Sequence, residues 1–205
     1  MSLNARTLAV ASVLAAAFAA ASADAACTYS VDPRGIKVEW TAFKFTQKQA
    51  VTGSFNTTKV SGPTQATTLV ELVKGLSMEI DGASIESGNP ARNATISEFF
   101  FQKFAPPSRI TGKTVDVEGD DAKGTLEIEI TLNGASRVVP FSYTISKDHQ
   151  VQATATIDMM DFALQKAYDT LHMACEEQHT GDDKVSKTWT EVGLKLTGTF
   201  AASCA

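Results

Sequence analysis

The sequence predicts an all-β protein: one closed antiparallel barrel of about eight strands with two or three short helices. In several separate stretches apolar residues alternate with polar ones, which is the period of a strand with one buried face. No stretch follows the alternating strand and helix order of a parallel sheet. Closure would also remove the exposed edges on which other chains could pair.

Residues 1–25 are typical of a secretory signal peptide. Arg6 precedes an apolar run over residues 8–21, and Ala23-Asp24-Ala25 has the A-x-A form of a signal-peptidase site. The run is short and rich in alanine, whereas spanning a bilayer takes about 20 strongly apolar residues. We therefore expect residues 26–205 to form one periplasmic domain, with no integral membrane segment after cleavage.

Strand alternation begins with Ile36, Val38, Trp40 and Ala42. Phe43 and Phe45 fall on the opposite phase, which predicts a bulge or bend near residue 42. Gly53 and Phe55 belong to the next strand. Residues 77–85 form a further strand after a helical stretch.

Three stretches have helical spacing instead. Residues 65–75 place apolar side chains three and four positions apart and predict a short amphipathic helix. Residues 94–104 are a second candidate. Residues 161–178 are a third, with Asp161 in the position of an N-cap.

The clearest strand pair covers residues 124–146. Its first half has an apolar face made by Leu126, Ile128, Ile130 and Leu132. Asn133-Gly134 is typical of a two-residue hairpin turn, and alternation then resumes over residues 139–145. The same pattern recurs over residues 151–157 and 192–200, so strands dominate the chain.

Charge and motifs exclude several classes of function. The formal net charge is −5 and no cluster of Lys and Arg appears, which argues against a nucleic-acid partner. The chain has no Gly-x-Ser-x-Gly elbow, no His-Glu-x-x-His and no Gly-rich phosphate loop. We therefore expect a protein that is not an enzyme and has no catalytic residues.

An exported chain with Cys27, Cys175 and Cys204 is expected to form one disulfide and keep one thiol. Cys27 comes just before the first strand and Cys204 just after the last. These strands are neighbours in a closed antiparallel barrel, which favours a bond between Cys27 and Cys204. A bond from Cys175 to either of them, or three reduced thiols, is the alternative.

His172, Cys175 and His179 lie at positions i, i+3 and i+7, so on one helix they would share a face and could ligate a metal or haem. The spacing is not a usual metal signature, and Gly181 indicates that the helix ends near His179. We expect no metal and no cofactor. A redox or metal accessory protein using these residues remains an alternative function.

Several short motifs follow one another from about Tyr29 to Phe200. They are Trp40-Thr41-Ala42-Phe43-Lys44, Gly53-Ser54-Phe55, residues 84–89 with Arg92, Phe99-Phe100, Gly124-Thr125-Leu126, Leu132-Asn133-Gly134 with Ser136-Arg137, and Asp161-Phe162. In order and spacing they resemble the YceI family of exported, polyisoprenoid-binding, lipocalin-like proteins. Asn93, where the family usually has Asp, and Ala163, where it usually has Gly, depart from the pattern.

The resemblance implies a lipocalin-like barrel with a long apolar tunnel for an isoprenoid or fatty-chain lipid, and it is compatible with a homodimer. Aromatic walls suit such a ligand, and the chain has 11 phenylalanines. The alternative is an interaction domain with a filled interior, because an eight-stranded barrel can do either. The residues expected to contact the lipid are Val38, Trp40, Phe43, Phe55, Phe100, Phe104, Leu126, Ile128, Ile130, Phe141, Tyr143 and Phe162.

Overall fold

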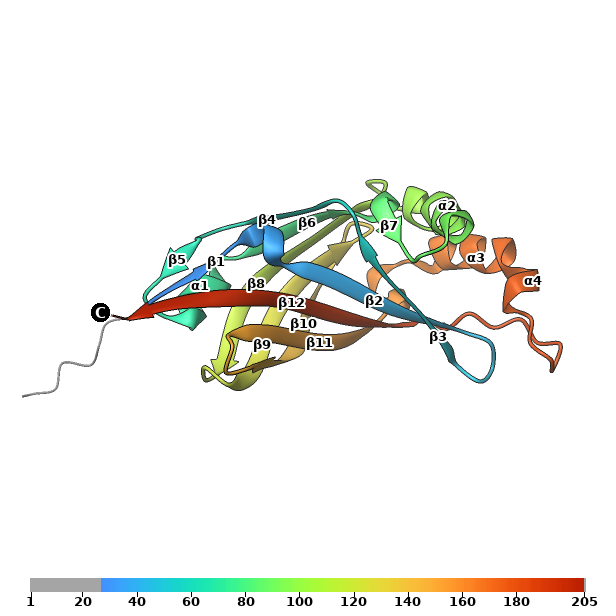
Figure 1. The fold of residues 1–205 in the computed structure, drawn as a ribbon. Helices are drawn as coiled ribbons and strands as arrows, with labels where there is room; N and C mark the ends of the chain where they lie inside the picture. The colour runs from blue at the N-terminus through green and yellow to red at the C-terminus, as the bar shows by residue number, and fades with distance from the viewer. Residues whose placement is uncertain (1–26, 205) are drawn as a thin grey trace, which may run out of the picture.

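The computed structural model describes residues 27–204, so the signal peptide expected at residues 1–25 lies outside the described residues. The body is elongated, and its strands run along the long axis (Figure 1). Helices α2 (Pro90–Phe99), α3 (Gln165–Ala174) and α4 (Glu176–His179) gather at one end, which we call the helix end. The C-terminus lies at the opposite end, beside α1 (Leu69–Lys74).

Within residues 27–204, one antiparallel sheet contains 12 strands. The strands are β1 (Cys27–Val31), β2 (Lys37–Lys44), β3 (Gln49–Phe55), β4 (Thr58–Ser61), β5 (Gln65–Ala66), β6 (Ser77–Asp81), β7 (Ile85–Glu86), β8 (Arg109–Gly119), β9 (Lys123–Leu132), β10 (Ala135–Ile145), β11 (Gln150–Asp158) and β12 (Glu191–Cys204). Their hydrogen-bonded order is β4-β6-β8-β9-β10-β11-β12-β2-β3-β7, and β1 pairs with β12 and β5.

The expected closed barrel of about eight strands is not confirmed, because the regular ladders stop at β4 and β7. The fold is an all-β, strongly curled antiparallel sheet with a few short helices. The interruption comes from two bent segments: β3 leads almost directly into β4, and β6 reaches β7 through a 3₁₀ turn at Gly82–Ser84. Two backbone bonds cross the break, from Asn56 N–H to Ser84 O at 2.9 Å and from Asp81 N–H to Thr57 O at 3.1 Å.

The hairpin predicted over residues 124–146 is formed by β9 and β10. Asn133 (φ 50°) and Gly134 (φ 77°) are both left-handed, as the tight hairpin turn requires. The Asn133 side chain also accepts from Ala105 N–H and donates to Ala163 O, both at 2.8 Å. The turn thereby holds two loops at the helix end.

The bend expected near residue 42 is absent. β2 pairs with β3 without a register shift from Glu39 to Lys44, and the chain reverses only afterwards, between the left-handed residues Phe45 and Lys48. Strict alternation therefore continues through Phe43. A register shift does occur in β8, between Thr114 and Asp116.

The three expected helices exist with different boundaries. Within 65–75 the helix is α1, which begins after the N-cap Thr68, and the second begins early at Pro90 because the Asn89 side chain caps it. The third is broken: Asp158, not Asp161, caps a 3₁₀ turn, Ala163 is left-handed, and Cys175 separates α3 from α4. No helix within residues 27–204 has the length and apolar character to cross a membrane.

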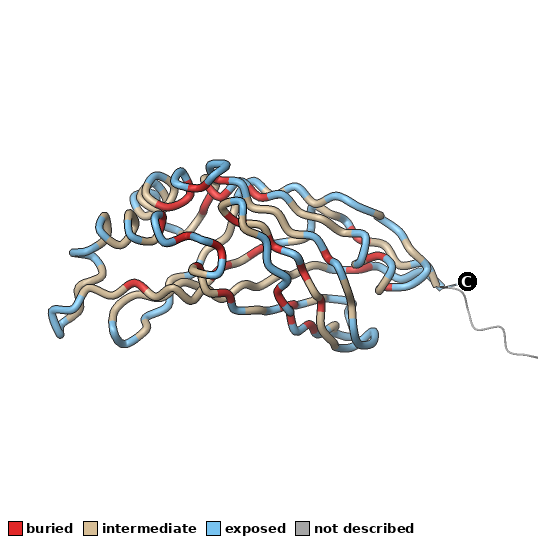
Figure 2. Tube along the Cα trace, turned by 180° about the vertical axis from the view of Figure 1, so that it is seen from behind, coloured by how far each residue is buried: buried red, intermediate tan, exposed pale blue. Residues whose placement is uncertain are grey.

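Buried residues follow the inner face of the sheet and continue beneath the helices (Figure 2). The larger cluster joins β9 and β10 to the 3₁₀ turns and helices of the helix end. A smaller cluster near the C-terminus consists of Val31, Leu69, Leu72 and Phe200. Both clusters contribute to the walls of one interior space.

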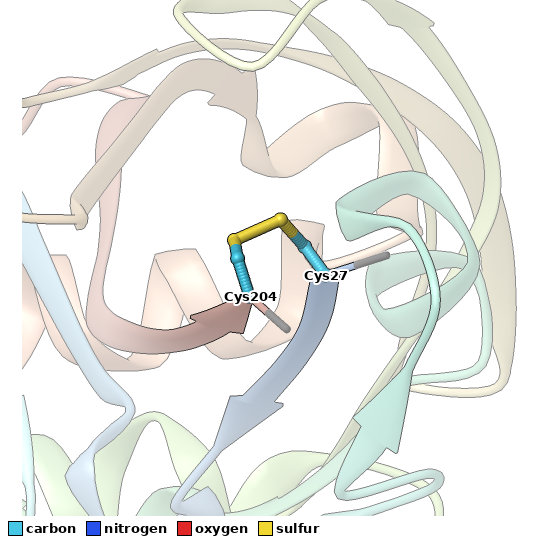
Figure 3. The surroundings of a disulfide bond; sticks show 2 residues. All are labelled: Cys27 and Cys204. Atoms are coloured by element: carbon cyan, nitrogen blue, oxygen red, sulfur yellow. A yellow bond between two sulfur atoms is a disulfide. The ribbon is translucent and has the colours of Figure 1, made fainter. Parts of the chain in front are cut away.

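Cys27 and Cys204 face each other across β1 and β12 and form a disulfide (Figure 3). The pairing is the one favoured by the neighbouring positions of the first and last strands. Cys175 is a free, half-buried thiol. A disulfide of this kind fits an exported protein.

Replacing Cys27 and Cys204 together by Ser should lower the free energy of unfolding by about 2–5 kcal/mol. The bond joins residues 177 positions apart, so its loss gives the unfolded chain much more conformational freedom. Urea unfolding of the oxidised protein measures the change. Cys175→Ser is the control and should keep the wild-type midpoint, whereas an unchanged midpoint in the double variant would contradict a stabilising bond.

Candidate functional site

The curled sheet encloses a cavity of about 280 Å³. Its lining extends from Val31 and Phe200 near the disulfide to Phe100 and Trp189 at the helix end. Pockets for small ligands usually measure about 300–1,000 Å³, so this volume lies at the lower limit. The side chains on its wall are almost all aliphatic or aromatic.

Most of the residues expected to contact a lipid line this cavity. They are Val38, Trp40, Phe55, Phe100, Phe104, Leu126, Ile128, Ile130 and Phe141. Side-chain alternation explains the strand residues, because every second position of β2 and β9 faces inward. Their contact with a ligand remains a prediction.

Phe43, Tyr143 and Phe162 do not line the cavity. Phe43 falls on the outer face of β2, opposite in phase to Trp40, and Lys48 Nζ lies 4.9 Å from its ring. Tyr143 donates its hydroxyl to Asp120 O at 2.7 Å and packs on the turn between β8 and β9. Phe162 is 1% exposed and fills the core below the helices.

Trp40 is held in the wall by a glycine on the neighbouring strand. Gly53 pairs with Trp40 across β2 and β3, and a Cβ atom there would collide with the indole and with Glu86 O. The indole N–H donates to Ser54 O at 3.3 Å. The motif Gly53-Ser54-Phe55 thus positions the large aromatic ring next to Phe55 in the cavity wall.

Four rings form an aromatic cluster at the helix end. Phe100 lies 5.1 Å from Phe101 and 5.2 Å from Phe104, and Phe55 lies 5.9 Å from Phe101, in edge-to-face contacts. All four line the cavity. Phe101 is the one of the four that was not expected to contact the lipid. Phe99 is only partly buried, with Lys103 Nζ 5.9 Å from its ring.

A polar network fixes the loop that leads into α2. Arg92 Nε donates to Ser87 Oγ at 2.8 Å and Arg92 Nη2 to Ser87 O at 2.7 Å. Ser87 in turn donates its N–H and its hydroxyl to Asn93 Oδ1, at 3.0 and 2.6 Å. Asn93 Oδ1 accepts both bonds from Ser87, as an Asp carboxylate could, and the Asn93 side chain also hydrogen-bonds Glu86, so this motif supports the start of the helix that leads to the aromatic cluster.

Sequence reasoning missed much of the wall. Ile80 and Ile110 on β6 and β8, Leu164 and Leu171 near α3, and Trp189 also line the cavity. The alternation over residues 192–200 was a sufficient signal for Leu194 and Leu196, which face inward on β12. Nothing local in residues 180–190 distinguishes Thr188 and Trp189 as wall residues.

Thr188 is the meeting point of the two histidines considered as metal ligands. Its Oγ1 lies 3.0 Å from His172 Nδ1 and 2.7 Å from His179 Nδ1, while Tyr168 donates its hydroxyl to Thr188 O at 2.9 Å. The helical face expected to contain His172, Cys175 and His179 is broken at Cys175. Within residues 27–204 no three His, Cys, Asp or Glu side chains meet as metal ligands.

Burial shifts the pKa values of His179 and Cys175. Loss of solvent, with contributions from Lys44 and His172, lowers the pKa of His179 to about 4. Burial also raises the pKa of the Cys175 thiol, and the nearby Lys44 offsets this only partly. Near pH 7 His179 is therefore neutral, the form in which a histidine can bind a metal, whereas the Cys175 thiol keeps the proton that it would have to lose to become a ligand.

Comparison with protein families finds that a YceI-like domain matches residues 29–200. No curated protein sequence matches the chain. Several solved structures share the fold at low sequence identity, so they bear on architecture alone.

A polyisoprenoid binding domain from Saccharophagus degradans, implicated in plant cell wall breakdown, is 17% identical, with a TM-score of 0.56 over 88% of this chain and 100% of that domain. BcnA of Burkholderia cenocepacia is 16% identical, with a TM-score of 0.57 over 83% and 99%. The YCEI protein of Campylobacter jejuni is 18% identical, with a TM-score of 0.52 over 80% and 90%.

Lowering the pH from 6.5 towards 4 should destabilise the fold through His179. In this interval the unfolded chain binds a proton at His179 that the folded protein does not. The free energy of unfolding therefore decreases as the pH is lowered, and this decrease stops near pH 4. Urea unfolding across this range measures the slope. His179→Asn can keep a hydrogen bond to Thr188 without titrating and should flatten the slope; parallel slopes in both proteins would be inconsistent with this assignment.

Proposed function

Because the chain belongs to the YceI-like domain family, we propose that it binds an apolar isoprenoid or fatty-chain lipid inside the curled sheet, without enzymatic chemistry. The observation that carries the proposal is the continuous apolar wall, which reaches from Phe200 to the aromatic cluster at the helix end. A long hydrocarbon chain needs such a wall and few polar partners.

The physical driving force is burial of the chain. Each methylene transferred from water gains about 0.8 kcal/mol, so an extended chain can outweigh the cost of association. The fold shared with a polyisoprenoid binding domain from Saccharophagus degradans supports an isoprenoid as the first ligand to test. The family resemblance and the disulfide support a periplasmic carrier or store of that lipid, with homodimerisation as a separate prediction.

A second depression, of about 310 Å³, lies on the outer face of β4, β6 and β8. It is bordered by charged side chains, among them Lys59, Glu79, Lys113 and Glu129. Its polar lining makes it a poor site for a hydrocarbon, and the proposed ligand therefore belongs to the interior.

The mature protein purified from its own periplasm should contain a stoichiometric isoprenoid or fatty-chain lipid. Native mass spectrometry detects the adduct, and organic extraction followed by lipid mass analysis assigns its class. A protein that is empty and also fails to take up added lipids would support the filled interaction domain instead.

Filling the cavity should prevent binding without unfolding the sheet. Gly112 lines the cavity, and a Cβ added there would have Ile128 Cγ2, at 3.6 Å, as its one neighbour within 4 Å, so Gly112→Leu should project into the space a lipid would use. We expect at least tenfold weaker lipid binding, because displaced chain carbons lose their burial.

Glu129→Leu is the matched control, since Glu129 is exposed and is not part of the cavity wall, and the substitution adds the same side chain to the outer face of the neighbouring strand β9. Circular dichroism checks that both variants fold. Equal lipid affinity in the folded Gly112→Leu variant and the control would show that the lipid does not bind in the cavity.

A further inference from the structure

Two buried polar side chains line the cavity, Thr114 and Thr188, which are 7% and 6% exposed. They lie on different parts of the wall. Thr114 is in the middle of β8, where its N–H donates to Leu76 O directly after α1, whereas Thr188 lies against α3 at the helix end (Figure 1). An amphiphilic ligand in this cavity has two places where a polar end could be accommodated.

Thr188 is the more firmly held of the two. Its hydroxyl lies between the Nδ1 atoms of His172 and His179, and its backbone carbonyl accepts from Tyr168, whose ring stacks on His172 at 5.9 Å. A backbone bridge to Lys44 ties the segment to β2. By contrast, no side-chain hydrogen bond of Thr114 exists within residues 27–204, so its hydroxyl is not oriented by a partner.

Hydrogen-bond capacity shows what Thr188 can still do. A hydroxyl has one proton and two acceptor lone pairs, and the two imidazoles use two of these three positions. One position remains for a ligand atom. Both imidazoles can also change tautomer, so the hydroxyl can meet a ligand either as donor or as acceptor.

The surroundings favour an uncharged partner. Lys113 is the only charged side chain on the cavity wall among the described residues, and it is exposed at the border of the outer depression, one position out of phase with the inward Gly112 and Thr114. Burying an ionised head group without a paired opposite charge is very costly. A neutral oxygen that makes one hydrogen bond avoids this cost.

We propose that Thr188, positioned by His172 and His179, binds the hydroxyl or carbonyl oxygen at the end of the lipid chain. The inference rests on the proposed lipid function and adds to it a ligand class and an orientation. The ligand is a long apolar chain that ends in one neutral oxygen, and this end lies at the helix end of the body. Phosphorylated chains are excluded by the same site.

The test compares three probes with the same saturated, branched chain: the alcohol phytanol, the hydrocarbon phytane, and phytanyl diphosphate. Displacement of a bound fluorescent lipid from the full mature protein measures each affinity. We expect phytanol to bind about three- to tenfold more tightly than phytane, the value of one buried hydrogen bond, and the diphosphate to bind least.

Thr188→Val should abolish the preference for the alcohol and leave phytane binding unchanged, which also shows that the cavity is intact. Thr188→Ser, which restores the hydroxyl, should restore the preference. Thr114→Val, which removes the other buried hydroxyl of the cavity wall, is the matched control and should keep the preference for the alcohol.

Tighter binding of the diphosphate, or an alcohol preference that survives in Thr188→Val, overturns the assignment to Thr188. Loss of the preference in Thr114→Val does so as well, because it places the oxygen at Thr114. If Thr188→Val does not fold, the ranking of the three probes on the wild type still tests the ligand class, because tighter binding of the diphosphate overturns the proposal. A wild-type protein that binds neither phytane nor the alcohol contradicts the lipid function itself.

Discussion

Inward-facing Leu126, Ile128 and Ile130 alternate along β9 with Glu127 and outward-facing Glu129, and the same two-residue period runs through β2, β10 and β12. This alternation makes one face of the sheet apolar and the other polar. Because the sheet curls, its apolar face surrounds one interior space. A register slip of one residue in a long strand would put polar side chains into the cavity, carboxylates in the case of β9, so the apolar interior depends on the register of the whole sheet.

The helix end is organised by polar groups that the strands do not supply. Asn133 joins the hairpin turn to two loops, the network of Ser87, Arg92 and Asn93 fixes the start of α2, and Thr188 gathers both histidines. Ser87, Arg92 and Asn93 are close together in the chain, whereas Asn133 bonds to groups 28 and 30 positions away and Thr188 to histidines 16 and 9 positions away. Together these polar groups hold the aromatic cluster over the cavity at a defined position.

Local patterns were sufficient for part of this structure. The hairpin of β9 and β10 followed from alternation and from Asn133-Gly134, since both signals act between neighbours in the chain. The disulfide followed from the order of the first and last strands. Whether the sheet closes into a barrel was not predictable in the same way, because this depends on bends at Asn56 and Gly82, where distant segments meet.

The late helix illustrates the same limit, as its periodicity predicted one helix although Ala163 and Cys175 interrupt it. Phe43 was assigned to the site because it is aromatic, yet its phase along β2 turns it outward. The residues next to Thr188 in the sequence do not indicate its role, because that role depends on its contacts with Tyr168, His172 and His179. Site residues whose role comes from contacts between separate segments are therefore the ones that patterns along the sequence do not reveal.

The bond between Cys27 and Cys204 joins residues 177 positions apart and thereby makes the described body a covalent ring. A mechanical pull applied to the two chain ends is carried by this single bond and bypasses the ladders between the strands. Thermal fraying cannot begin at a terminus either, because β1 and β12 are fastened at their outermost residues. The first segments to open must then be internal ones, and the break between β4 and β7 has the fewest backbone bonds to lose.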